Sequence, residues 1–190
     1  MTERYSREDL HAAKTTLQDG GVILYPTDTI WGLGCKISDK ESVQKIFDIK
    51  GRDASKKCIL LFGSEIQMER YFDEIPEQAW ELLECADNPL TLVLEGGKFP
   101  DYLLSADGTI GVRIVEDIFC KQLIQQIKEP IISTSANLSG QSNPKSFSEI
   151  SKKIKDKVDY VVEFKQKSKT PSKPSSIIKL KKNGEIKILR

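Results

Sequence analysis

The sequence contains a single histidine, His11, among its 190 residues. Catalytic sites of the Ser-His-Asp or Cys-His type use a histidine as the general base. His11 lies near the start of the chain, in a segment that we expect to form a surface helix. Hydrolytic chemistry through a protein nucleophile is therefore disfavoured.

Paired cysteines and long apolar segments are also missing. The four cysteines are widely spaced and form no C-x-x-C pair, so we expect no metal site; they are Cys35, Cys58, Cys85 and Cys120. The first ten residues lack the apolar core of a signal peptide, and no apolar run approaches the length of a membrane span. We therefore expect a cytoplasmic protein with reduced thiols and no membrane contact.

Net charge gives no general attraction to nucleic acid or membrane, because 29 Lys and Arg residues balance 28 Asp and Glu residues. Charge is uneven locally: residues 65–87 are acidic and residues 145–190 are rich in lysine. The simplest interpretation of both stretches is a solvated surface. A chain of this length with 38% apolar residues is expected to form a single domain over residues 1–190.

Apolar patterning predicts strands that alternate with helices. Helices are expected from the capping pairs Ser38/Glu41, Ser64/Gln67 and Ser146/Glu149, from Pro76, and from Asp117 to Ile127. Strands are expected at residues 22–25, 59–62, 91–95, 110–114, 159–164, 176–180 and 185–189, with the last two joined by an Asn183-Gly184 turn. A further strand is expected to begin at residues 131–132 and to run into residues 133–137. This order predicts an α/β fold with an open, mixed sheet and flanking helices.

Two polar segments follow predicted strands. Residues 26–34 (PTDTIWGLG) combine hydroxyls, a carboxylate and two glycines that permit close backbone approach, but a plain glycine turn explains them equally well. Residues 133–140 (STSANLSG) offer small donors suited to phosphate oxygens, although Ser and Asn also cap ordinary turns. Neither segment matches a known phosphate loop by itself.

Three cations are candidates for binding. Lys50 and Arg52 are two residues apart and would project to the same side of an extended segment, as a triphosphate requires; alternatively, both are solvated surface charges. Arg113 lies on a predicted strand, opposite the face that Ile110 and Val112 bury, which favours a binding role.

Taken in order, PTDTIWGLG, KGR, TIGVR (residues 109–113) and STSANLSG resemble the YrdC family of threonylcarbamoyl-AMP synthases, over nearly the whole chain. The resemblance implies a twisted α/β sheet that encloses a large basic cavity. It also implies a nucleotidyltransferase that joins L-threonine, bicarbonate and ATP, with Mg²⁺ bridging the phosphates, and releases pyrophosphate. A downstream threonylcarbamoyl transferase would then modify tRNA, and contact with tRNA itself is a further expectation.

The resemblance also assigns the site residues. Lys50, Arg52, Ser135 and Asn137 would form the catalytic group, and the wider set that contacts the nucleotide would add Lys56, Thr109, Asn143 and Arg190. L-Threonine would be held by Thr29, Arg113, Ser133 and Ser175. Because Ser175 follows the polar residues 165–174, we expect that loop to act as a mobile lid.

The sequence departs from the family pattern at three places near the Lys50–Arg52 pair. Asp53 replaces a usual proline, Lys57-Cys58 replaces a Pro-Leu or Gly-Leu pair, and Leu61 stands where some members have histidine. These changes keep open the alternative of a paralogue that adenylates another substrate. A second alternative is an RNA-binding module without synthase activity, in which the concave basic surface and the lysine-rich end of the chain bind the phosphate backbone. The low aromatic content, 7%, argues against the second, because stacking on bases uses aromatic side chains.

Overall fold

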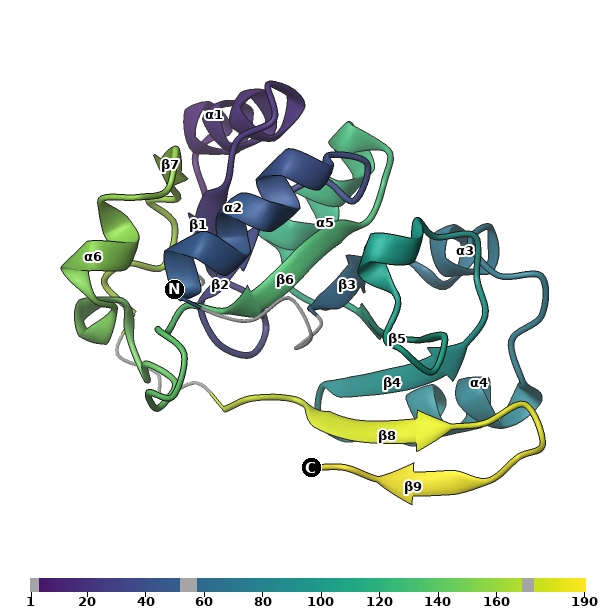
Figure 1. Cartoon of the computed structure of the whole chain (residues 1–190). Helices are drawn as coiled ribbons and strands as arrows, with labels where there is room; N and C mark the ends of the chain where they lie inside the picture. The colour runs from purple at the N-terminus through teal and green to yellow at the C-terminus, as the bar shows by residue number, and fades with distance from the viewer. Residues whose placement is uncertain (1–3, 52–57, 169–172) are drawn as a thin grey trace.

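The computed structural model describes residues 4–51, 58–168 and 173–190, in which one mixed sheet carries the fold (Figure 1). The strand order is β7-β1-β2-β6-β3-β5-β4-β8-β9. The strands are β1 (Ile23–Tyr25), β2 (Gly32–Gly34), β3 (Ile59–Phe62), β4 (Leu90–Glu95), β5 (Thr109–Ile114), β6 (Ile131–Ser135), β7 (Tyr160–Val161), β8 (Ser176–Leu180) and β9 (Ile186–Ile188). The open, mixed α/β sheet expected from the sequence is confirmed.

Helices pack on both faces of this sheet. They are α1 (Arg7–Gln18), α2 (Lys40–Lys50), α3 (Glu65–Glu69), α4 (Glu77–Glu84), α5 (Ile118–Ile127) and α6 (Lys152–Lys155). The apolar side chains of α1 and α5 form one core cluster, whereas those of α2, α3 and α4 join another. No helix in the described part of the chain is long and apolar enough to cross a membrane.

Strand alternation divides neighbouring residues between the two clusters. Leu60 belongs to the cluster with α2, and Leu61 belongs to the cluster with α1 and α5. Arg113 is directly opposite Leu61, and Ser133 is directly opposite Ile59, so all four side chains lie on the α1/α5 face. Arg113 and Ser133 therefore lie on the same face of the sheet as the apolar residues that α1 and α5 cover.

Two expected helix starts are wrong. The helix predicted from Ser38 is capped by Asp39, whose carboxylate accepts from the Ser42 amide at 3.1 Å. The Ser38 hydroxyl instead donates to Glu129 at 3.2 Å. Ser146 is followed only by a 3₁₀ turn, and α6 begins after Ser151, which caps it.

One expected strand and one expected turn also differ from the structure. The strand predicted over residues 159–164 is limited to Tyr160–Val161, which pairs with β1. The glycine-rich segment expected as a turn contains β2, which pairs with β1 and β6. A side chain at Gly34 would place its Cβ 2.7 Å from the Ile132 carbonyl oxygen, so glycine permits this close pairing.

Candidate functional site

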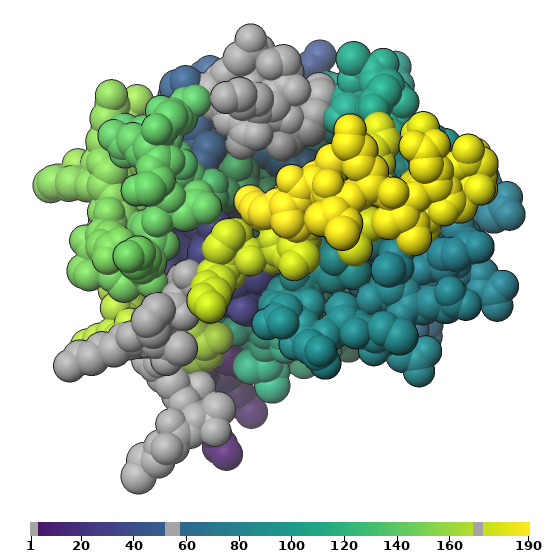
Figure 2. Space-filling model, turned by 90° about the horizontal axis from the view of Figure 1, so that it is seen from below, coloured from purple at the N-terminus to yellow at the C-terminus, as the bar shows by residue number. Residues whose placement is uncertain are grey.

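Polar residues from distant parts of the chain line one cavity of about 240 Å³ beside the sheet centre. Among its lining residues are seven that the sequence predicted: Thr29, Arg113, Ser133, Ser135, Asn143, Ser175 and Arg190. Figure 2 shows the surface hollowed between the C-terminal strands, in yellow, and the green segment that follows β6. The structure therefore brings together the complete predicted threonine set and part of the predicted nucleotide set.

Arg113 is the central cation of this cavity and is only 3% exposed. One terminal nitrogen, Nη1, donates to the Thr29 hydroxyl at 2.8 Å. The other, Nη2, lies 3.1 Å from a carboxylate oxygen of Asp28. Within the described residues, Nε of Arg113 has no hydrogen-bond partner. A buried donor without a partner is costly, so this nitrogen is suited to bind an anionic ligand group.

Arg190 provides a second cation from the C-terminal strand. Its Nε donates to the Ser175 carbonyl at 3.0 Å, and the Ser175 hydroxyl lies 2.8 Å from the Thr91 hydroxyl. Burial lowers the pKa of Arg190, and the positive charge of Arg113 lowers it further. Two arginines that repel each other in one cavity are stabilised when an anion binds between them.

Lys50 lies beneath the segment after β6 and is 2% exposed. Its ammonium donates to the Asn137 carbonyl at 2.8 Å, to the Asn137 side-chain oxygen at 3.3 Å, and to the Ser135 carbonyl. In this arrangement Lys50 fixes the Ser135–Asn137 segment, and its expected contact with nucleotide stays a prediction.

Ser135 and Asn137 form the other half of this group. The Ser135 hydroxyl donates to the Asn137 side-chain oxygen at 2.5 Å, and the Asn137 amide donates to the Gln141 carbonyl at 2.6 Å. Asn137 lines a neighbouring cavity of about 400 Å³, to which Asn143 also belongs. Because Asn143 lines both cavities, the two are continuous at this residue.

Thr109 lines a neighbouring groove of about 570 Å³, which shares Cys58, Ile59 and Ile177 with the central cavity. Its hydroxyl donates to Asp107 at 2.7 Å. The other Asp107 carboxylate oxygen accepts from Lys179 at 2.5 Å. Chiefly through this bond to Lys179, the pKa of Asp107 is lowered to about 2.

Five positions named in the sequence analysis lie outside the described residues or away from the cavity lining. Arg52 and Lys56 lie outside the described residues, as do Asp53 and Lys57, so their roles and the basic character of the whole cavity stay predictions. Leu61, at the position that is histidine in some relatives, is fully buried in the apolar cluster under α1 and α5.

A third polar cavity, of about 670 Å³, adjoins the first through Thr29, Ile30 and Trp31. Lys145, Lys165 and Lys173 line it, and Lys165 also forms an ion pair with Asp117 at 2.5 Å. Part of the predicted lid lies outside the described residues, so its movement stays a prediction.

Sequence reasoning missed the partners of the site residues. Asp28 was recognised only as a carboxylate near a cleft, and Thr27 and Asp107 were given no role. The PTDT segment contains both Thr27 and Asp28, but the contacts of Asp28 and Thr29 with Arg113 span more than eighty residues and have no local pattern.

The described residues contain no group of three or more His, Cys, Asp or Glu side chains that could hold a metal ion. Asp28, the carboxylate next to Arg113, also accepts from the Glu116 amide at 3.0 Å, so it is already paired within the protein.

Comparison with known proteins places the whole chain in a family. A family model for Sua5, YciO and YrdC proteins, described as "Telomere recombination", matches residues 15–190. A threonylcarbamoyl-AMP synthase of Pseudoalteromonas translucida is 35% identical over 80% of this chain and 83% of its own length.

Solved structures agree with this match. Pyrococcus abyssi Sua5 complexed with L-threonine superimposes with a TM-score of 0.86 at 28% identity, over 99% of this chain and 55% of that one. E. coli YciO superimposes with a TM-score of 0.85 at 25% identity, over 99% of this chain and 91% of its own.

Proposed function

The chain belongs to the Sua5/YciO/YrdC family, and we propose that it acts as an L-threonylcarbamoyladenylate synthase, a nucleotidyltransferase. The observation that carries the proposal is the position of Arg113. Arg113 lines the central cavity together with Thr29, Ser133 and Ser175, the other residues assigned to threonine, and a similar fold in P. abyssi Sua5 binds L-threonine.

The proposed reaction has two steps. The threonine nitrogen attacks the bicarbonate carbon and water leaves, which gives a carbamate. A carbamate oxygen then attacks the α-phosphorus of ATP, and the bond from that phosphorus to the bridging oxygen breaks, so pyrophosphate leaves. Neither step needs a protein nucleophile, which agrees with a chain whose single histidine, His11, is exposed on α1.

The residues of the cavity contribute binding and electrostatic stabilisation. Arg113 binds the threonine carboxylate, and Ser133 and Ser175 contact the amino acid. Ser135, Asn143 and Arg190 face the nucleotide, where fixed donors stabilise the negative charge that grows on the phosphates. Thr109 contacts the nucleotide from the neighbouring groove. Arg52 and Lys56 complete the phosphate site in this proposal.

Mg²⁺ would enter as a complex with ATP, since it keeps most of its ligands from water and substrate phosphates. The product passes to a threonylcarbamoyl transferase that modifies tRNA, and contact with tRNA is a further part of the proposal. Since ATP and tRNA are cytoplasmic, the reaction is placed there.

Pyrophosphate release tests the proposal. The protein is incubated with ATP and Mg²⁺, and L-threonine or bicarbonate is omitted in turn. The synthase requires both, so each omission should abolish release. Equal release without threonine would overturn the proposal, and equal turnover with L-serine or another amino acid would favour the paralogue alternative. Salt-sensitive RNA binding that ATP does not affect, with no release at all, would favour the RNA-binding alternative.

A further inference from the structure

The Thr27 hydroxyl lies beside the central cavity, and three neighbours contact its oxygen. It lies 2.8 Å from the Ile30 carbonyl oxygen, 3.0 Å from the Thr29 amide nitrogen and 2.9 Å from the Thr29 hydroxyl oxygen. Thr27 and Thr29 are both buried. Water therefore has little access to exchange these bonds.

The chemistry of the partners determines the direction of each bond. A hydroxyl has one proton to donate and two lone pairs that accept. A carbonyl only accepts, so the Thr27 proton goes to Ile30, and an amide only donates, so Thr29 N–H occupies one lone pair. The remaining lone pair of Thr27 must accept the proton of the Thr29 hydroxyl.

The same count applies to Thr29. Its only hydroxyl proton is used by Thr27, and one lone pair accepts from Nη1 of Arg113 at 2.8 Å. One lone pair remains, on a side chain that lines the cavity and is 7% exposed. Toward a ligand, Thr29 is therefore an acceptor only.

We propose that Thr27 is a positioning residue, which holds the Thr29 hydroxyl as an acceptor for the amino group of the amino-acid substrate. The inference rests on the proposed function, because it assumes an amino acid in this cavity. A carboxylate has no proton to donate, so it cannot bond to this lone pair and is directed to the guanidinium of Arg113, which lines the same cavity. The amine, one carbon away from the carboxylate, supplies the N–H that Thr29 accepts.

Two variants and two ligands test this arrangement. Thr27→Val keeps the shape and removes the hydroxyl, whereas Thr27→Ser keeps the hydroxyl. Thr16→Val is the matched control, because the Thr16 hydroxyl donates to a backbone carbonyl, Ala12, at 2.9 Å on α1. Calorimetry measures the Kd of L-threonine and of L-2-aminobutyrate, which has the amine and carboxylate but no hydroxyl. Unfolding midpoints check that each variant is folded.

Thr27→Val should raise the Kd of L-threonine about tenfold, because the loss of one hydrogen bond of roughly 1.4 kcal/mol corresponds to that change. Thr27→Ser should restore the affinity, Thr16→Val should not change it, and the KM for ATP should stay within about twofold of wild type in all three. The same tenfold loss for L-2-aminobutyrate identifies the amine as the partner. A loss that disappears with L-2-aminobutyrate would assign the bond to the ligand hydroxyl and overturn the inference.

An unchanged Kd in folded Thr27→Val would also overturn it. If that variant does not fold, Thr29→Val, which removes the acceptor itself, is measured with the same two ligands. The proposed function can fail separately: wild-type protein that binds threonine with this pattern but forms no threonylcarbamoyl-AMP would overturn the function and support the inference. Product formation together with an unchanged Thr27→Val Kd would overturn the inference alone.

Discussion

Lys50 and Asn137 are joined by two hydrogen bonds, from one ammonium to the backbone oxygen at 2.8 Å and to the side-chain oxygen at 3.3 Å. This contact joins the last residue of α2 to the segment after β6. Since Asn137 also accepts from Ser135, one buried charge organises two residues assigned to catalysis. Lys50 thus acts on the site through the backbone that it holds.

Replacing Lys50 should therefore cost both stability and activity. Lys50→Met keeps the apolar stem but leaves buried carbonyl oxygens without a donor, so the free energy of unfolding should fall by about 2 kcal/mol. Urea unfolding measures this change, and pyrophosphate release should fall with it. Lys45→Met is the control, because its ion pair with Asp159 is about 40% exposed and should contribute less than about 1 kcal/mol. Equal losses in both variants would contradict this role.

Replacing Asp28 should raise the KM for L-threonine and leave the KM for ATP nearly unchanged. Asp28→Asn removes the charge that lies 3.1 Å from Nη2 of Arg113, so the guanidinium is less firmly oriented. We expect the KM for L-threonine to rise about tenfold, as for the loss of one charge-assisted contact. The KM for ATP should change little. Asp73→Asn, which removes an exposed partner of Lys98, is the matched control. A larger effect on ATP than on threonine would contradict the assignment of Asp28.

The pKa of Asp107 tests its hydrogen bonds in the groove beside the central cavity. Its pKa is about 2, below the ordinary value of 3.8, because Lys179 and Thr109 hydrogen-bond to the charged form. Their contribution to stability is therefore present above pH 3.8 and is lost as the pH falls toward 2. NMR titration should give this midpoint, and Lys179→Met should raise it. Lys181→Met, whose partner is Glu185, should leave it unchanged, and an ordinary Asp107 midpoint in wild type would refute the contact.

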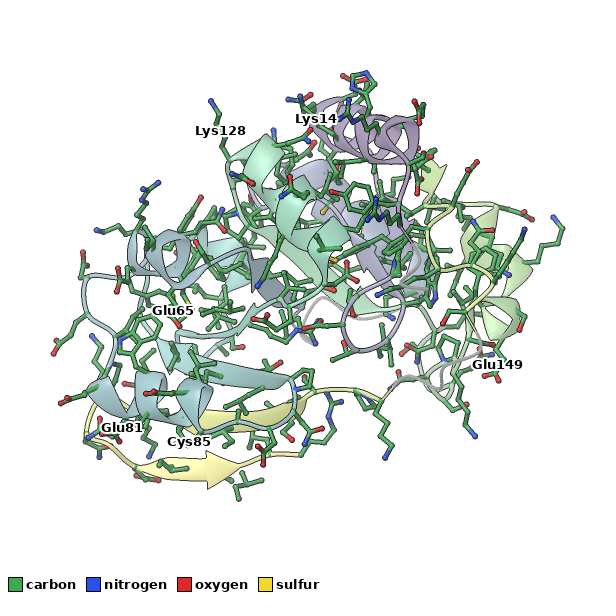
Figure 3. The ribbon with its side chains drawn as sticks, turned by 180° about the vertical axis from the view of Figure 1, so that it is seen from behind. Lys14, Glu65, Glu81, Cys85, Lys128 and Glu149 are labelled. Atoms are coloured by element: carbon green, nitrogen blue, oxygen red, sulfur yellow. The ribbon has the colours of Figure 1, made fainter. Side chains whose placement is uncertain are left out.

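The cysteines should separate into two reactive and two protected thiols. Cys35 and Cys120 are buried, and burial raises the pKa of both thiols, so neither should react in folded protein. Cys85 is exposed, just after α4 and at the opposite end of the molecule from Glu149 (Figure 3). Cys58 is partly exposed and lines the central cavity.

A thiol reagent followed by mass spectrometry measures this pattern. ATP with L-threonine should protect Cys58 and leave Cys85 as reactive as before, so Cys85 is an internal control. Equal protection of both cysteines would indicate a general change of structure and would contradict the location of the ligand beside Cys58.

Local patterns in the sequence predicted much of the sheet. The alternation of Ile110, Val112 and Ile114 placed Arg113 on the opposite face, and the structure has it there. The Asn183-Gly184 turn correctly joined β8 and β9, since Gly184 takes the positive φ of 83° that such a turn needs. Both features depend on neighbours in the sequence, which a single chain displays.

Features that depend on distant contacts were not predictable in this way. Gly32 and Gly34 disfavour a strand locally, and β2 forms because β1 and β6 pair with it on both sides. The direction of the Lys50 side chain depends on carbonyls more than eighty residues away. The order of motifs and the family resemblance supplied the candidate residues, and the structure supplied the contacts of Thr27 and Asp28.

The identity of the product tests the central claim most directly. The protein is incubated with ATP, Mg²⁺, L-threonine and bicarbonate labelled with ¹³C, and the nucleotide product is analysed by mass spectrometry. The account predicts threonylcarbamoyl-AMP that carries one ¹³C atom, in the carbamoyl carbon. An adenylate of threonine without the labelled carbon, or no nucleotide product, would contradict it.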